Sequence, residues 1–354
     1  MMFSMEEIWG QYGMDGLQQK LDALFGQSRV SLWEMFERIL SGDVLGAVTD
    51  TISGAVNGMA EHVQSVKNVF IWLLVLGITA ALISHFIEIF DSHQVADIGF
   101  YFTYLLISAV LLKCFLSSAA TAAQTLNRIV EFVRIFVPAY FLSVGVATGT
   151  LTAAAGYQII LLLIYLVEHV LLTLILPFIY SYVLLAVVNG LWIEEKLAML
   201  VDGMEKAIRF LLKASLGLVT GASAFQSMIT PAIDSVKTTT MQKAVSAIPG
   251  VGDVADGVVE VVLGSAVVIK NSMGLVFLLL LLALAAAPLA EIFLTGVLLK
   301  ATAAFLGIVS DKRVTACTDK VGNGSRLLCR TVGTAVLLFL IAVSVAAYTT
   351  NRGF

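Results

Sequence analysis

The chain has 354 residues, of which 59% are hydrophobic and 13% are charged, with a formal net charge of −4 and a mean hydropathy of +0.94. A water-soluble domain of this length could not cover so much apolar surface with so few charges. The acidic balance is concentrated in residues 1–68, which hold four Lys or Arg against nine Asp or Glu. The composition indicates a membrane protein that works in a lipid bilayer, and it provides no basic footprint for nucleic acid.

Residues 1–68 contain no apolar run long enough to cross a bilayer, but they show helical periodicity. Ser31 is suited to cap a helix whose apolar residues recur on one face of 32–40. A second amphipathic stretch follows from Leu45 to Val66. Two interpretations remain open: the helices lie on the membrane surface or pack on the bundle, or they form an arm that binds a partner.

Seven apolar stretches fill the rest of the chain. A helix rises about 1.5 Å per residue, so roughly 20 residues cross a hydrocarbon core of about 30 Å. The stretches are continuous rather than alternating, which argues against a barrel. The sequence therefore predicts an all-α polytopic membrane bundle of about seven spans within a transmembrane domain at 69–349. The predicted spans are 69–90, 98–120, 135–155, 157–190, 207–230, 274–308 and 331–349.

Two of these stretches are longer than a single crossing requires. Stretches 157–190 and 274–308 contain 34 and 35 residues, and each holds a proline, Pro177 and Pro288. Proline removes a backbone donor and kinks or splits a helix. Helix breaks are therefore expected at both prolines.

Ionisable residues lie close to both prolines. Glu168 and His169 precede Pro177, and Glu291 follows Pro288. Interrupted helices with nearby polar groups are the sequence pattern of a transport site near the bilayer midplane. The alternative is a long kinked helix that projects from the membrane and places its carboxylate near the lipid headgroups.

Basic residues cluster at two places, 196–213 and 312–330. If both clusters are cytoplasmic, the spans at 207–230 and 274–308 each cross once, and 231–272 lies on the other side. Thr239 and Lys320 are then expected on opposite sides of the membrane. The side on which the N-terminus lies depends on whether 157–190 crosses once or twice, and the sequence leaves this open.

The span at 207–230 has a face with little side-chain bulk. Gly217, Gly221, Ser223 and Ser227 form this face. Small residues four apart allow two helices to approach closely. Close packing is one interpretation, and a hydroxyl-bearing face that lines a pathway is the other.

Residues 231–272 are predicted to form an interfacial helical hairpin. Pro and Gly residues at 249–252 are typical of a turn between two amphipathic helices. The ordered features of this region are Asp234, Lys243, Pro249, Gly250, Gly252, Lys270, Asn271 and the Gly274 that opens the next span.

This order of elements resembles the bacterial stage III sporulation protein AE family, and the pattern of spans extends the resemblance over roughly 30–350. The resemblance implies an integral subunit of a channel or secretion-like complex that joins mother cell and forespore, in the mother-cell membrane around the forespore. It also implies partners: other membrane proteins of the complex, a cytoplasmic ATPase and ring-forming proteins between the membranes. Many members begin with an export signal, whereas Met1–Gly10 lacks a basic start and an apolar core.

Two functions remain open, a channel or permease-like subunit and a scaffold that conducts nothing. The chain carries no phosphate-binding, nucleophile-elbow or zinc-protease motif, so an enzyme is not expected. No cofactor is expected either. Cys114 lies in an apolar run and Cys317 and Cys329 in an expected polar loop, and all three are predicted to be free thiols. The oligomeric state and any transported species cannot be derived from the sequence.

Overall fold

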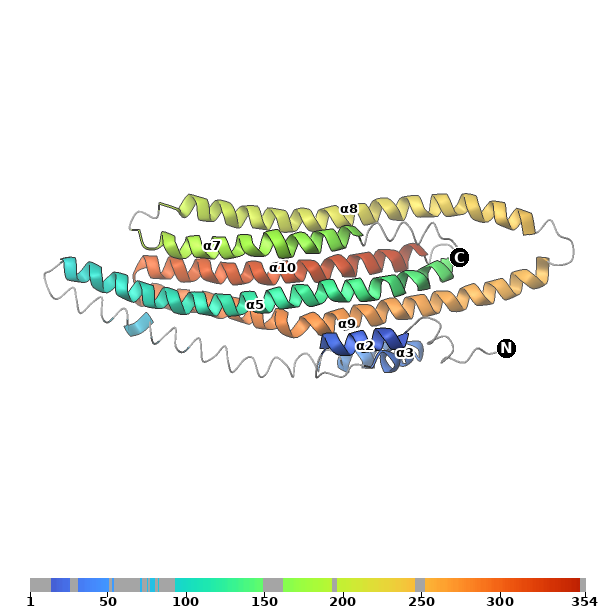
Figure 1. The fold of residues 1–354 in the computed structure, drawn as a ribbon, viewed down its shortest axis with the longest axis horizontal. Helices are drawn as coiled ribbons and strands as arrows, with labels where there is room; N and C mark the ends of the chain where they lie inside the picture. Colours follow the sequence, from blue (N-terminus) through green and yellow to red (C-terminus); the bar gives the residue numbers. More distant parts are fainter. Residues whose placement is uncertain are drawn as a thin grey trace.

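The computed structural model describes residues 14–25, 31–50, 93–148, 162–192, 196–245 and 252–350, with a few isolated positions between 53 and 82. In this part of the chain every regular element is a helix (Figure 1). The helices are α2 (Met14–Phe25), α3 (Leu32–Leu40), α5 (His93–Thr148), the π-helical η1 (Leu171–Ile175), α7 (Leu176–Asn189), α8 (Ala198–Val245), α9 (Gly252–Val309) and α10 (Lys312–Thr350).

The five long helical segments form one elongated bundle with nearly parallel axes (Figure 1). The α8 helix lies at one edge and α9 near the other, and α10 lies between them. The central α10 packs against α5, α7, α8 and α9. Among the membrane-span candidates α10 is also the most buried and α8 the least. The bundle is therefore organised around α10.

Five helices in the described part of the chain are long and apolar enough to cross a membrane. The predicted all-α membrane bundle is confirmed, whereas a count of seven spans is not. The five segments are Ile98–Phe136, Leu162–Asn189, Ala198–Phe225, Asn271–Ile308 and Lys312–Ser344. The first predicted span, 69–90, lies almost entirely outside the described residues.

The predicted spans 98–120 and 135–155 meet in a single helix, because α5 runs without interruption from His93 to Thr148. Residues 149–155 lie outside the described residues. The expected connection fails to appear because its apolar residues also recur at helical spacing. Leu126, Ile129 and Phe132 are fully buried, so this segment packs on the bundle as the same helix.

Residues 312–330, expected to be a polar loop, form the first half of α10. Val314, Cys317, Val321 and Leu328 are buried along one face of this segment. Because charged residues lie between these positions, the apolar periodicity was not recognised as a helix. The expectation of a loop was wrong.

The two arms of the predicted hairpin are continuous with the spans beside them. The first arm is the end of α8, which extends to Val245, and the second is the start of α9 at Gly252. Both arms reach the end of the bundle opposite the connections α7–α8 and α9–α10 (Figure 1). The turn between them, including Pro249 and Gly250, lies outside the described residues.

The two prolines behave differently. Pro177 lies in the first turn of α7, directly after the π-helical turn η1. The helix Leu162–Asn189 continues through Pro177 with this wider turn, so the expected break at Pro177 is a single π turn and not an interruption. Pro288 lies inside α9, which continues through it to Val309. The expected break at Pro288 is therefore wrong: a proline removes one backbone hydrogen bond, and the packed apolar helix on either side keeps its course.

The N-terminal helices pack on the bundle. The Ser31 hydroxyl accepts a hydrogen bond from the Glu34 backbone amide at 3.2 Å, which makes Ser31 the cap of α3 as predicted. Leu32, Phe36 and Ile39 are buried on the apolar face of α3. The α3 helix packs against α9, and α2 packs against α5. Packing on the bundle is thus the interpretation that the described helices support.

Aromatic side chains join α5, α9 and α10. Phe132 of α5 contacts Phe339 of α10 edge to face, with ring centroids 5.8 Å apart. Phe136 of α5 contacts Phe277 of α9 in the same way at 4.9 Å. Each such pair adds about 0.5–1.5 kcal/mol to the effect of burial. These rings fix the relative positions of α5, α9 and α10.

Gly324 allows α10 to approach α7 and α5. A Cβ at this position would collide with the side chain of Val183 and would lie 3.2 Å from Cε2 of Phe115. We expect Gly324→Ala to lower the free energy of unfolding by about 1–3 kcal/mol through overpacking. Thermal unfolding of the purified protein in detergent measures this effect.

Gly333 on the same helix provides the matched control. No atom lies within 4 Å of a Cβ added there. Gly333→Ala should leave the melting temperature unchanged or raise it, because alanine favours a helix by about 1 kcal/mol over glycine. Equal destabilisation by both substitutions would show that close packing at Gly324 is not the cause.

Two introduced cysteines test the direction of α8 and α9. Thr239 lies on the C-terminal arm of α8, and Lys312 begins α10 at the other end of the bundle. In a background without native cysteines, we expect Thr239→Cys and Lys312→Cys to react with an impermeant maleimide from opposite sides of the membrane. Labelling of both from one side would contradict a single crossing by α9, the helix that separates the two positions in the chain.

Candidate functional site

Glu168 stands out among the candidate residues because its carboxylate is fully buried. Its side chain is 0% exposed, and neither carboxylate oxygen has a hydrogen-bond partner among the described residues. It lies in the helical segment that leads directly into the π turn Leu171–Ile175. An intramembrane carboxylate is costly and usually belongs to a functional site, and π turns frequently occur at such sites.

His169 and Glu291 differ from Glu168. The side chain of His169 is exposed, as expected because successive residues point about 100° apart on a helix. Glu291 is half-buried on α9, where the Thr121 hydroxyl donates to Oε1 at 3.4 Å. The helices α5 and α10 lie between α7 and α9 (Figure 1). The structure therefore does not bring Glu168 and Glu291 into one site.

The small-residue face of α8 is divided by the packing. Gly217 and Gly221 are exposed, and no atom lies within 4 Å of a Cβ added to either. Ser223 is fully buried, and its hydroxyl has no hydrogen-bond partner. Close packing against the described residues therefore does not explain the two glycines. The side chain of Ser227 lies outside the described residues.

The family-like motif is described only at its end. Asp234 and Lys243 lie on the C-terminal arm of α8 and Lys270 on the N-terminal part of α9, but their side chains are outside the described residues. Asn271 is half-buried on α9. Gly274 is buried, and a Cβ there would lie 3.1 Å from Cε2 of Tyr140 on α5. Gly274 thus allows a close approach of α5 and α9.

An ionic network at the end of the bundle near the α7–α8 turn was not predicted from the sequence. Lys320 of α10 pairs with Asp202 of α8 and lies 3.9 Å from Oε2 of Glu205. The Tyr182 hydroxyl of α7 donates to Glu205 Oε2 at 3.1 Å, and Arg209 pairs with the other oxygen of Glu205. The network thus joins α7, α8 and α10.

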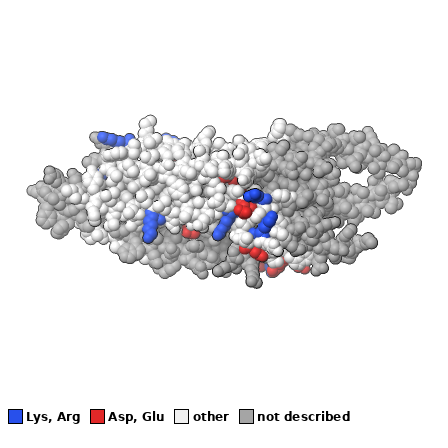
Figure 2. Space-filling view, viewed as in Figure 1, with Lys and Arg blue, Asp and Glu red and all other residues white. Residues whose placement is uncertain are grey.

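A second ion pair connects α9 to α10 in the same part of the bundle. Lys300 Nζ lies 2.5 Å from Oδ1 of Asp319. The only local signal for these contacts is the spacing of four residues between Glu205 and Arg209. Lys320 and Asp202 are 118 residues apart, so no sequence pattern could have paired them. Figure 2 shows that charged side chains are sparse on the visible described surface and lie in small groups.

Metal chemistry has no candidate site within the described ranges. No group of three or more His, Cys, Asp or Glu side chains there could hold a metal ion. Cys114, Cys317 and Cys329 are free thiols, and Cys317 is buried.

The architecture defines the class of protein, a multi-pass membrane protein built from α-helices. The family model of stage III sporulation protein AE matches residues 30–350, and the chain belongs to this family. A curated relative, the stage III sporulation protein AE of Bacillus subtilis (strain 168), is 18% identical over 274 residues, which cover 77% of this chain and 69% of the relative. No solved structure matches the chain. The resemblance drawn from the sequence is confirmed, and the chain is a sporulation membrane protein.

Removal of Lys320 tests the contribution of the ionic network to stability. Lys320→Ala removes the ion pair of Asp202 and one of the positive charges near Glu205. We expect a loss of about 1–2 kcal/mol, between the values for exposed and buried pairs, because Lys320 is 31% exposed. Thermal unfolding in detergent at low salt measures it.

Lys312→Ala is the control for this substitution. Lys312 is exposed and forms no ion pair with any described residue. Its removal changes the net charge equally but should shift the melting temperature little. If both variants melt at the same temperature as the parent protein, the network does not stabilise the bundle.

Proposed function

We propose that the chain is the channel or permease-like subunit of a sporulation membrane complex that links mother cell and forespore. The single observation that carries this proposal is Glu168, a fully buried carboxylate beside a π turn that has no hydrogen-bond partner in the described part of the chain. A carboxylate kept in such surroundings without a structural partner is better explained by a cation or proton that it meets during function.

The family supports the further parts of the proposal. The complex includes other membrane proteins, a cytoplasmic ATPase and ring-forming proteins between the two membranes. The chain lies as a multi-pass protein in the mother-cell membrane around the forespore. It performs no chemistry of its own, and the ATPase supplies the energy.

A scaffold that conducts nothing is the second candidate, and the buried threonines favour it. The hydroxyls of Thr302, Thr318 and Thr331 donate to carbonyls four residues earlier on their own helices, at 2.8–2.9 Å. These hydroxyls are used within the helices. An aqueous path requires a continuous polar lining, which these buried threonines do not supply.

Substitutions of Glu168 separate the two functions. We expect Glu168→Gln and Glu168→Leu to reduce the yield of heat-resistant spores at least about tenfold if the carboxylate serves a pathway. Both variants should still co-purify with the membrane partners, because Glu168 makes no hydrogen bond that holds the fold. Glu131→Gln, an exposed carboxylate on α5, is the matched control and should sporulate normally.

The scaffold predicts a different pattern. Normal spore yield in both Glu168 variants, with intact co-purification, would exclude a charge-dependent pathway through Glu168. Glu168→Leu should then raise the melting temperature, because it removes the desolvation penalty of an unpaired carboxylate.

A further inference from the structure

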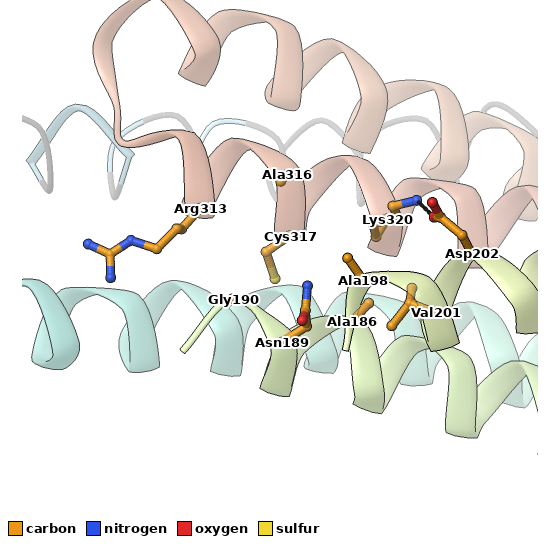
Figure 3. Close-up of a pocket in the computed structure, with 10 residues that line it drawn as sticks. All are labelled: Ala186, Asn189, Gly190, Ala198, Val201, Asp202, Arg313, Ala316, Cys317 and Lys320. Atoms are coloured by element: carbon orange, nitrogen blue, oxygen red, sulfur yellow. Dashed lines mark hydrogen bonds and ion pairs between the residues drawn. The ribbon is translucent and has the colours of Figure 1, made fainter. Parts of the chain in front are cut away.

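A small cavity lies at the turn between α7 and α8, against the first turns of α10 (Figure 3). Its volume is about 90 Å³. The volume per molecule of liquid water is about 30 Å³, so the cavity has room for a small polyatomic group. Its polar lining consists of Asn189, Asp202, Arg313, Cys317 and Lys320, and small residues form the rest.

Asn189 offers a free donor to this cavity. Its Oδ1 accepts a hydrogen bond from the Leu197 backbone amide at 2.7 Å, which fixes the orientation of the side-chain amide. The amide nitrogen therefore points the other way, toward Cys317 in Figure 3. No described group accepts from this nitrogen. The α7–α8 turn thus presents an unused N–H pair to the cavity.

The two cations line opposite ends of the cavity (Figure 3). Arg313 stacks on the Phe100 ring at 3.5 Å, and its Nε and one terminal nitrogen lie 3.3 and 3.4 Å from the two carboxylate oxygens of Asp311. Both contacts are long, and the Asp311 side chain is 38% exposed, so the pair contributes little to stability. A guanidinium carries five N–H donors in all. Arg313 can therefore exchange this weak contact for a bound anion.

The ammonium group of Lys320 has N–H donors that its ion pair with Asp202 does not use. Its ammonium group pairs with Asp202 and lies 3.9 Å from Glu205. An ammonium group carries three N–H donors, and only Asp202 is within hydrogen-bonding distance. Arg313, Lys320 and Asp202 give the lining itself a net positive charge, while the carboxylates of Asp311 and Glu205 lie outside the lining beside the two cations.

A helix N-terminus adds further positive charge beside the cavity. Ala198, the first residue of α8, and Ala316, in the second turn of α10, both line the cavity. The N-terminus of a long helix carries roughly half a positive elementary charge. The N-terminus of α8 beside two cations favours an anion, and phosphate is an anion whose oxygens can accept from several N–H donors.

The surface beside the cavity is apolar and exposed. Trp192 is 43% exposed and Met199 is 90% exposed, and both lie on the α7–α8 connection or the first turn of α8. Asn189 is the last residue of the apolar span Leu162–Asn189. Tryptophan and basic side chains at the end of a span are typical of the membrane–water boundary. A ligand at this position meets acyl chains on one side and cations on the other.

We propose that this cavity binds the phosphate of an anionic phospholipid headgroup. The Asn189 amide, Arg313 and Lys320 donate to the phosphate oxygens, and the acyl chains lie along the exposed apolar residues of the α7–α8 connection. The assignment is independent of any pathway through Glu168.

Thermal unfolding of the full chain in detergent, with added lipid, tests this site. We expect phosphatidylglycerol to raise the melting temperature saturably by about 2–4 °C and phosphatidylcholine to raise it much less. Arg313→Gln and Asn189→Asp should each weaken the phosphatidylglycerol effect by roughly tenfold in midpoint concentration. Asn189→Asp keeps the acceptor for the Leu197 amide and replaces the free donor with a negative charge, so it separates binding from folding.

Lys312→Gln provides the matched control, because Lys312 is one residue from Arg313 but does not line the cavity. Its response to phosphatidylglycerol should equal that of the parent chain. An equal loss in Lys312→Gln and Arg313→Gln would indicate diffuse surface charge and overturn the site. Equal stabilisation by inorganic phosphate, lost in the same variants, would assign the cavity to a free anion and overturn the lipid assignment.

Discussion

The packing of α10 against α5, α7, α8 and α9 is the contact on which the rest of the structure depends. A helix surrounded in this way needs small residues where its neighbours come close and large ones where they separate. Gly322 faces Leu299 and Lys300 of α9, and Gly324 faces Val183 of α7. Phe339 fills the space toward α5. These small and large residues set the distance of each neighbouring helix from α10.

Ionisable groups in the bundle fall into two physically distinct kinds. At one end Lys320, Asp202 and Glu205 compensate one another across helices, so their burial is balanced by attraction and hydrogen bonds. Farther along the bundle Glu168 has no such partner among the residues that the structure describes. The first arrangement is sufficient to hold helices together, whereas the second contributes nothing to that end. We therefore assign a structural role to the network around Lys320 and a functional role to Glu168.

The lengths of the helices exceed the bilayer. At about 1.5 Å per residue, the 48 residues of α8 span about 72 Å and the 58 residues of α9 about 87 Å. A hydrocarbon core of about 30 Å accommodates less than half of either helix. The rest must lie in the headgroup regions, in water or against other proteins.

The sequence by itself determined the properties that depend on neighbouring residues. Hydropathy over about 20 residues predicted the helical spans, the cap at Ser31 followed from one residue type before an amphipathic run, and the order of elements indicated the family. Only the tertiary structure decided that 312–330 is helical, that Gly217 is exposed and that Glu168 is buried without a partner. The physical reason is that burial and ion pairing depend on side chains from distant segments, as with Lys320 and Asp202, and local patterns do not record which segments meet.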